Sequence, residues 1–205
     1  MNLPPDDGVP AFIEQAMALK HVLRQGWIDR GVSSVESVAD HSWSVAMLAW
    51  FLAAERDELD RHRVLLLGLV HDLPESQAGD TTPLDEHRDS QGQIDPQHFT
   101  SAVHYSDSTS TAKRQREISA LEQMLRPLSP EVAEEISDAW HEYDREESPE
   151  ARFVKQVDKL ETVIQAVRYR RNQPEIIIGS FIAGARRDIT DPQLTQILEA
   201  VLTGE

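Results

Sequence analysis

The sequence predicts an all-α protein with a single domain over residues 1–205. Apolar residues recur at helical spacing along most of the chain. Ser129, Ser148 and Asp191 each stand directly before a proline, a pattern that is typical of helix starts. No two segments show the alternation expected of paired strands, and a chain of 205 residues can bury one sizeable core.

The first half of the chain predicts three helices. The first covers residues 12–23 and is amphipathic, and the second covers residues 38–54. The third covers residues 61–73 and is nearly all apolar between residues 64 and 70, so we expect it to be central and buried. The apolar stripe of the second helix consists of Val45, Leu48, Phe51 and Leu52.

The second half predicts further helices with clear start signals. One begins near Ala112 and ends before Pro127. Ser129 and Ser148 are the predicted caps of the next two, each followed by proline and glutamate, and the later of these runs to about residue 172. Asp191 caps a short final helix, whereas residues 174–188 favour strand at their start but are assigned to helix because no partner strand is evident.

Residues 84–111 interrupt this pattern, because they are polar and show no period. The predicted domain therefore has a core at about residues 12–172, a polar insert at 84–111 and a helical tail at 174–203. A long aperiodic segment inside a compact domain is either a disordered surface loop or a functional element such as a lid over a site.

Composition restricts the kinds of function. The formal net charge of −16, without a cluster of Lys and Arg, argues against a nucleic-acid partner. No apolar run reaches the length of about 18 residues that predicts a membrane span, and residues 1–10 lack the pattern of a signal peptide, so we expect a cytoplasmic protein. There is no cysteine, and any bound metal must therefore be held by histidine and carboxylates.

Potential metal ligands occur at three places. His71 and Asp72 end the apolar third helix, where Pro74 interrupts the backbone hydrogen bonding. Glu75 and Asp80 follow in the next turn and can face the same ion. His41 lies early in the second helix, and Asp158 sits in mid-helix beside an apolar stripe, where an unpaired carboxylate is costly.

Each of these residues also has a structural interpretation. A histidine on an apolar face is commonly a hydrogen-bonded core residue, and Asp72 could simply begin a surface turn. Asp158 could form a salt bridge with Lys155 or Lys159. Spacing within any one of the three segments does not decide between these alternatives.

Considered together, three sequence runs resemble the HD-domain metal-dependent phosphohydrolases, in particular their 5′-deoxynucleotidase branch. These are Glu-Ser-Val-Ala-Asp-His-Ser-Trp at 36–43, His-Asp-Leu-Pro-Glu at 71–75 with Gly-Asp-Thr-Thr-Pro at 79–83, and Phe-Val-Lys-Gln-Val-Asp-Lys at 153–159. The resemblance covers about residues 16–171 and implies a compact helical HD-domain fold with a metal site between helices. It implies a homodimer as well.

The resemblance also implies roles for individual residues. The metal ligands would be His41, His71, Asp72 and Asp158. Glu75 would assist catalysis, and Glu75 with Asp80 would hold a second ion. Thr81, Thr82 and Pro83 would contact the nucleotide, together with Trp27 and an arginine, for which Arg24 and Arg30 are the candidates because Gly26 precedes the tryptophan.

The expected activity is divalent-metal-dependent hydrolysis of 5′-deoxynucleoside monophosphates, with Mn, Co, Mg, Fe or Zn as the cation. Two alternatives are a phosphohydrolase for cyclic or polyphosphorylated nucleotides and a non-enzymatic metal-binding module. The other aromatic residues are expected to pack: Trp43 and Trp50 in the core, and Trp140 and Tyr143 as packing residues instead of a platform on which a base stacks. The remaining histidines, expected at the surface or in the core, are His21, His62, His87, His98, His104 and His141.

Overall fold

The computed structural model describes residues 8–204, so part of the N-terminal segment assessed for a signal peptide lies outside the described residues. Within them the protein is built from α-helices and short 3-10 turns, which confirms the predicted all-α class. The elements are α1 (Gly8–Ala18), η1 (Leu19–His21), α2 (Gln25–Ile28), α3 (Val38–Leu52), α4 (Arg61–Val70), α5 (Glu75–Ala78), η2 (Pro83–His87), η3 (Pro96–Phe99), α6 (Asp107–Leu125), α7 (Pro130–Arg145), α8 (Pro149–Asn172), α9 (Gly179–Asp188) and α10 (Pro192–Thr203).

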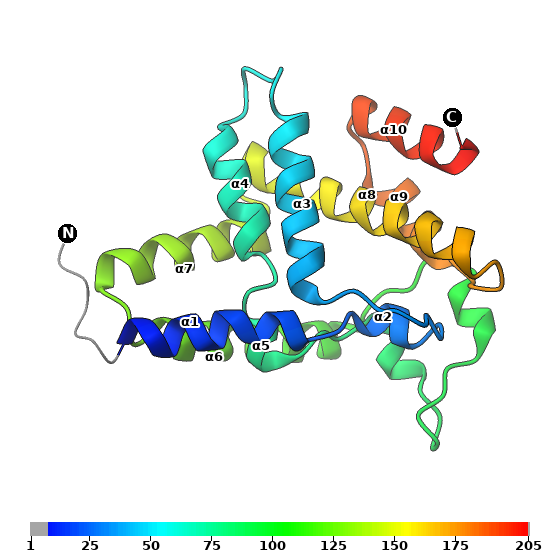
Figure 1. The fold of residues 1–205 in the computed structure, drawn as a ribbon, viewed down its shortest axis with the longest axis horizontal. Helices are drawn as coiled ribbons and strands as arrows, with labels where there is room; N and C mark the ends of the chain where they lie inside the picture. Colours follow the sequence, from blue (N-terminus) through cyan, green and yellow to red (C-terminus); the bar gives the residue numbers. More distant parts are fainter. Residues whose placement is uncertain (1–7, 205) are drawn as a thin grey trace.

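Helices α3, α4 and α8 form the centre of the molecule. Figure 1 shows α3 and α4 side by side with α8 crossing behind them, and all three pack against one another. Val45, Val64 and Leu160 contribute fully buried side chains to the shared core. Helices α3 and α8 carry His41 and Asp158, and His71 and Asp72 directly follow α4, so the hydrophobic core fixes the relative positions of the predicted ligands.

A glycine allows the closest approach between α3 and α4. A Cβ atom on Gly68 would lie 2.7 Å from the Cα of Ala46, which is closer than real side-chain carbons come to backbone. The small residues Ala46 and Ala49 lie buried on α3. Backbone therefore meets backbone at this crossing, a few residues from His41 on one helix and from His71 on the other.

The packing face of α3 differs from the prediction. Val45 and Leu52 are buried and Leu48 is partly so, but Phe51 is 67% exposed. Trp43 is 63% exposed, so its assignment to the core is wrong, and Trp50 is only partly buried. The reason is the close crossing with α4, which selects small residues for the inner face and leaves the bulky ones outside.

Several helix ends also differ. The first helical stretch ends at His21, because residues 22–23 are extended and Val38 N donates to the carbonyl of Val22 at 2.8 Å. Helix α4 ends at Val70 instead of Leu73, with His71 as its C-cap. Residues 174–178 are irregular, and Ile176 and Ile178 are buried in the core without forming a strand.

The polar insert is shorter and more structured than expected. Helix α6 begins at Asp107 instead of Ala112, because the Ser106 side chain caps its first turn by accepting from Thr109 N. Turns η2 and η3 each bury one apolar residue, Leu84 and Phe99 respectively. The insert therefore packs onto the domain.

The three proline start signals are confirmed as the starts of α7, α8 and α10.

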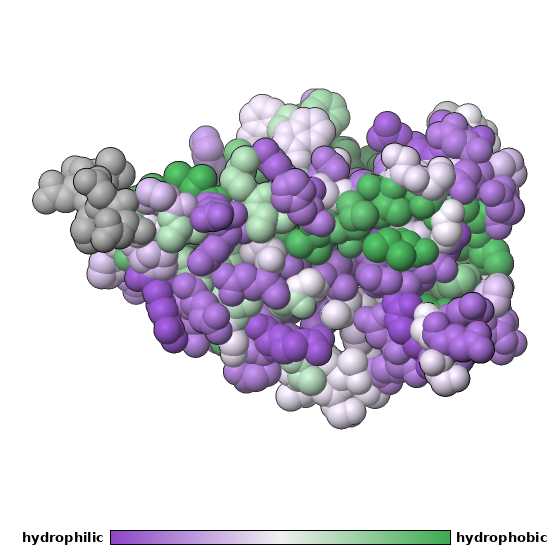
Figure 2. Space-filling view, turned by 60° about the horizontal axis from the view of Figure 1, so that its bottom comes forward, coloured by the Kyte–Doolittle hydropathy of each residue, from purple (hydrophilic) through white to green (hydrophobic). Residues whose placement is uncertain are grey.

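The face drawn in Figure 2 is mostly hydrophilic, with a contiguous apolar patch to the right of its centre. Among residues 8–204, no helix combines the length and the apolar character needed to cross a membrane.

Candidate metal centre and substrate cavity

The fold brings together the four predicted metal ligands. Ligand atoms of His41, His71 and Asp72 lie within 4.8 Å of one another. Asp158 joins this group from α8, with its Oδ1 3.2 Å from His41 Nε2. The Oδ2 atom of Asp72 lies 3.1 Å from His71 Nε2 and 3.8 Å from His41 Nε2.

Both histidines present a free ring nitrogen to this group. His41 Nδ1 is held by Glu161 Oε2 at 2.7 Å, and His71 Nδ1 by the carbonyl of Gly68 at 2.8 Å. The Nε2 atoms of both rings are buried and have no hydrogen-bond partner among the described residues. Two buried, unsatisfied nitrogens that face two carboxylates fit a divalent cation, and the nitrogen–oxygen donor set suits Mn, Co, Mg, Fe or Zn.

The pKa values of Asp72 and His41 reflect the charged groups that surround them. Burial alone would raise the pKa of Asp72, but His71 and Arg24 hold that pKa well below its usual range. Burial and Arg24 lower the pKa of His41, yet the adjacent carboxylates of Asp158 and Glu161 raise it overall to about 10. The centre therefore attracts positive charge strongly, and a cation and a proton would compete for the same imidazole nitrogen.

Glu75 and Asp80 do not belong to the 4.8 Å group, but they line the same cavity as Asp72 and Asp158. Pro74 precedes α5, and Glu75 at the start of α5 is 3% exposed, with its Oε2 buried and without a hydrogen-bond partner among residues 8–204. Burial, reinforced by Asp72 and Asp80, raises the pKa of Glu75 well above its usual range. Glu75 is thus a carboxyl group that binds a proton more tightly than an exposed glutamate does.

A turn returns the chain from α5 to the cavity. Gly79 adopts φ of 76°, a conformation that favours glycine, and Asp80 follows it. Asp80 Oδ2 accepts from the backbone N–H of Gln25 at 2.7 Å, and its Oδ1 lies 3.9 Å from Arg24. Burial and Asp72 raise the pKa of Asp80 although Arg24 opposes them.

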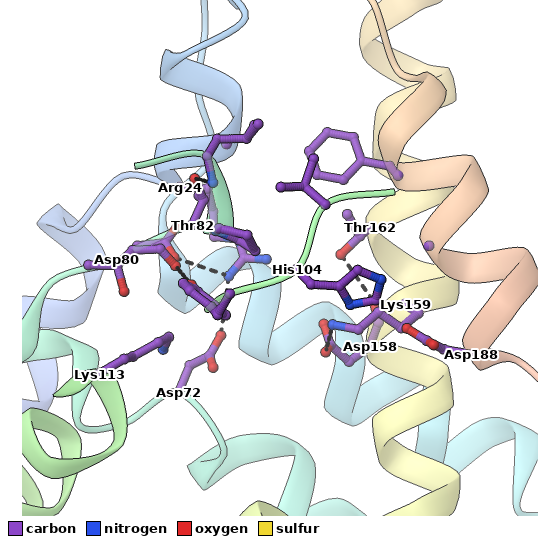
Figure 3. Close-up of a pocket in the computed structure, with 18 of the residues that line it drawn as sticks. Arg24, Asp72, Asp80, Thr82, His104, Lys113, Asp158, Lys159, Thr162 and Asp188 are labelled. Carbon is purple, nitrogen blue, oxygen red and sulfur yellow. Dashed lines mark hydrogen bonds and ion pairs between the residues drawn. The ribbon is translucent and has the colours of Figure 1, made fainter. Parts of the chain in front are cut away.

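His71, Asp72, Glu75, Asp80 and Asp158 line a cavity of about 500 Å³. In Figure 3, Arg24, Asp80 and Thr82 lie on one side and Lys159 and Thr162 on the other, with Asp72 and Asp158 below. All of the predicted substrate contacts line the cavity: Arg24, Trp27, Thr81, Thr82 and Pro83.

The two candidate arginines have different surroundings. Arg24 Nη1 lies 3.3 Å from Asp72 Oδ2, which places its guanidinium at the metal centre. Arg30 is bound by Ser180, by Gly26 O and by Ile177 O, and it lies between the rings of Phe99 and Phe181. The geometry therefore favours Arg24 as the arginine that meets a phosphate.

The aromatic residues have mixed roles. Trp27 is 2% exposed, donates from Nε1 to Glu36 at 2.9 Å and packs against Tyr169 and Phe181, so it is mainly a buried wall. Trp140 is packed as expected and donates to the carbonyl of His71 at 3.0 Å.

The HD domain family matches residues 16–195 of this chain. The chain belongs to the HD domain family.

Curated relatives and solved structures are similar over most of their length. The chain is 33% identical over 191 residues to the 5′-deoxynucleotidase HDDC2 of Dictyostelium discoideum, covering 88% of this chain and 90% of the relative. It is 30% identical to the protein of that name from Bos taurus, covering 91% and 80%.

Among structures, a conserved hypothetical protein from Pyrococcus furiosus aligns with a TM-score of 0.68 at 28% identity, covering 94% of this chain and 98% of that one. The predicted metal-dependent phosphohydrolase from Magnetospirillum magnetotacticum aligns with a TM-score of 0.64 at 24% identity, covering 98% and 93%, and this second likeness supports the fold alone.

The structure of this HD domain adds residues that the sequence reasoning missed. Glu161, which holds His41, lies one turn after Asp158 on the same apolar helix, and a buried acid at that spacing was the available signal. Lys113 Nζ lies 3.3 Å from Glu75 Oε1 and comes from the polar start of α6, where no pattern marked it. His104 and Tyr143 line the cavity, although they were expected only to be surface or packing residues.

Proposed function

We propose that this HD-domain protein is a metal-dependent phosphomonoesterase that hydrolyses 5′-deoxynucleoside monophosphates to deoxynucleoside and phosphate. The supporting observation is the group of His41, His71, Asp72 and Asp158, of which the last three line a cavity that Glu75 lines as well. The proposed substrate class is inferred from the relatives named 5′-deoxynucleotidase. The cavity volume of about 500 Å³ lies in the range of small-molecule sites.

The four ligands would hold one divalent cation, and Glu75 with Asp80 would hold a second if one binds. The cation supplies Lewis-acid polarisation of a phosphoryl oxygen and activation of water. Glu161 and the Gly68 carbonyl keep both histidines in the tautomer that leaves Nε2 free. We propose Mn, Co, Mg, Fe or Zn as the ion.

Glu75 is the proposed proton-transfer residue. Burial raises the pKa of its carboxyl group well above the usual range, a shift of the kind found in general acid–base catalysts. It acts either as the base toward the attacking water or as the acid toward the leaving 5′ oxygen. The neighbouring Lys113 ammonium, 3.3 Å away, holds one of its oxygens in place.

Arg24 is the proposed phosphate-orienting residue, and the 81–83 turn the proposed sugar contact. The buried Oγ1 of Thr81 has no hydrogen-bond partner among the described residues and is available to a ligand. Tyr105 donates its hydroxyl to the carbonyl of Thr81, and residues 103–105 line the cavity. We therefore propose that this end of the polar insert acts as a lid.

The sugar preference gives the sharpest test. A site closed against C2′ would leave a ribose hydroxyl without a partner, at a cost of about 1–3 kcal/mol, or roughly 10- to 200-fold in kcat/KM. We expect deoxynucleoside monophosphates to be preferred over their ribonucleotide counterparts by this factor, with little dependence on the base. The measurement compares kcat/KM for matched 5′ pairs and for 5′ against 3′ phosphates.

The same panel distinguishes the alternatives. Equal values for deoxy and ribo substrates would remove the sugar specificity while keeping the phosphomonoesterase. Preference for a cyclic or polyphosphorylated nucleotide would change the substrate class. Metal binding without hydrolysis of any nucleotide would indicate a binding module.

We also propose a cytoplasmic homodimer. On α3, Trp43, Met47 and Phe51 recur every four residues and are 63%, 41% and 67% exposed, which forms an apolar stripe on the surface. A second copy of the chain is the occupant that the family resemblance suggests for this stripe.

A further inference from the structure

The cationic side chains of the cavity differ in whether the protein already neutralises them. Five line the cavity and have a carboxylate oxygen within 4.0 Å: Arg24, Lys113, Arg114, Lys159 and Arg187. Arg30 has no such carboxylate among the described residues, but carbonyls, Ser180 and two aromatic rings occupy its guanidinium. These six cations are therefore committed to protein groups.

Lys155 is the exception. Within residues 8–204, its ammonium has no carboxylate within 4.0 Å and no hydrogen bond to a protein acceptor. It lines the cavity and lies 4.1 Å from the centroid of the Tyr143 ring. It also precedes Lys159 by four residues, so the two ammonium groups project from the same face of α8, one turn apart.

This arrangement disfavours a protonated lysine when the cavity contains only solvent. Burial and the neighbouring Lys159 lower the pKa of Lys155, and the carboxylates of Asp158, Glu146 and Asp144, which form no ion pair with it, offset only part of this shift. The aromatic face of Tyr143 compensates for only part of that cost, since a cation–π contact provides less than a desolvated ion pair. An anion in the cavity would supply the missing partner.

The position of Lys155 indicates which anion fits. The Tyr143 hydroxyl donates to Asp158 Oδ2 at 3.3 Å, so one phenol ring separates the Lys155 ammonium from a metal-site carboxylate. A phosphate group carries a charge of about −1.5 to −2 and several acceptor oxygens. A phosphate held at the metal centre would thus lie between Arg24 on one side and α8 on the other (Figure 3).

We propose that Lys155 is an anion-binding residue of the cavity and that it contacts the phosphate of the bound nucleotide. The substrate identity rests on the proposed function, whereas recognition of a phosphate dianion does not. Lys155 is a substrate-binding residue in this proposal and takes no part in proton transfer. The alternative is a purely structural role, in which Lys155 only packs on the Tyr143 ring.

The test uses the metal-loaded full chain. Lys155→Met removes the charge and keeps the length of the side chain, Lys155→Arg restores a charge, and Arg168→Met removes an exposed charge from the same helix as the matched control. The readouts are calorimetric binding of inorganic phosphate, KM and kcat for a deoxynucleoside monophosphate, and metal content.

We expect Lys155→Met to weaken phosphate binding and raise KM by about 10- to 100-fold, because a charge-assisted hydrogen bond is lost. Metal content should match that of the parent, Lys155→Arg should recover most of the binding, and Arg168→Met should behave like the parent. Phosphate binding and KM within twofold of the parent in folded Lys155→Met would overturn the proposal, as would equal losses in Lys155→Met and Lys155→Arg.

The two proposals fail in different ways. A parent enzyme that hydrolyses no deoxynucleotide would refute the proposed function, yet the phosphate titration would still decide the role of Lys155. Normal deoxynucleotide kinetics in Lys155→Met would refute the role of Lys155 and leave the proposed function in place.

Discussion

Each of the two histidines at the candidate metal centre, His41 and His71, has one ring nitrogen held by the protein and one directed at carboxylates. Asp72 lies near both Nε2 atoms, at 3.1 Å from that of His71 and 3.8 Å from that of His41. The residue also follows directly after the C-cap of α4, so its replacement leaves the helical framework in place.

Asp72→Ala is therefore expected to lose most of its bound metal and to lower turnover by at least about 10²-fold, because the several kcal/mol supplied by the cation disappear. Metal analysis and circular dichroism of the purified variant check this, with the exposed Asp138→Ala as control. Full metal occupancy in Asp72→Ala would contradict the assignment of this ligand.

Glu75→Gln keeps the size of the side chain and removes its ionisable group. If Glu75 transfers a proton, kcat should fall by about 10²–10⁴-fold while substrate binding is nearly retained. If Glu75 instead holds a second ion, excess metal should restore part of the activity. Kinetics over a range of metal concentrations separate these roles, and a variant as active as the parent at ordinary metal concentration excludes both.

A residue of the candidate site could be predicted best when the neighbouring sequence alone marked it. His71 and Asp72 stood out because they end an apolar helix, but only the resemblance of the three runs to one family implied that they share a metal with His41 and Asp158. Asp158 stood out because a carboxylate beside an apolar stripe needs a partner. Its salt bridge to Lys159, at 3.0 Å, was one of the alternatives and coexists with the contact to His41. The sequence suggested Lys155 only as a possible salt-bridge partner of Asp158. That the Lys155 ammonium has no carboxylate partner could not be predicted, because it depends on distances between residues in the folded protein.

At the scale of elements, α10 shows how one side chain defines a helix start and its tertiary contact. Asp191 accepts from the backbone N–H groups of Gln193 and Leu194 at 3.0 Å. The same carboxylate binds Arg56 through two contacts of 2.6 Å and 2.8 Å, and the Arg56 guanidinium lies 4.6 Å from the Phe153 ring centroid.

Two substitutions separate these roles. Asp191→Asn keeps a capping oxygen and loses the ion pair, so we expect a loss of about 1 kcal/mol in the free energy of unfolding. Asp191→Ala loses the cap as well, which adds about 0.5–2 kcal/mol. Urea denaturation measures both, and equal stability of the two variants would contradict the capping contribution.

The ion pair also predicts a pH dependence. Hydrogen bonding to Arg56 holds the pKa of Asp191 below its usual 3.8, so its stabilisation is present above that value and is lost as the pH falls through the folded-state pKa. The difference between the parent and Asp191→Asn should therefore shrink between about pH 5 and about pH 3. A difference that stays constant over this interval would exclude the charge as its cause.

Helices that begin with a capping side chain were the most predictable. The capping residue and the proline after it mark the helix start within a few residues of sequence. Ser148 and Asp191 show this for α8 and α10. The start of α6 was missed by five residues because Ser106 sits in a run of similar polar residues. Ile176 and Ile178 were misassigned because their burial comes from distant helices, which no local period reveals.

At the scale of the whole molecule, the apolar stripe on α3 predicts self-association. Replacing Trp43 and Phe51 together with glutamate should convert a dimer to a monomer while helical content is retained. Size-exclusion chromatography with light scattering measures the mass, and Ile13→Glu, at an exposed apolar position on α1, is the matched control. A monomeric parent would show that the stripe serves another purpose.

The crossing of α3 and α4 at Gly68 has a consequence for protein engineering. Gly68 permits the backbone contact with Ala46, and its carbonyl accepts from His71 Nδ1 at 2.8 Å. One residue thus sets both the spacing of the helices and the orientation of a ligand. A designer who transfers the four ligands to another helical scaffold must transfer this crossing too, because a helix pair held apart by side chains would carry the ligands without their geometry.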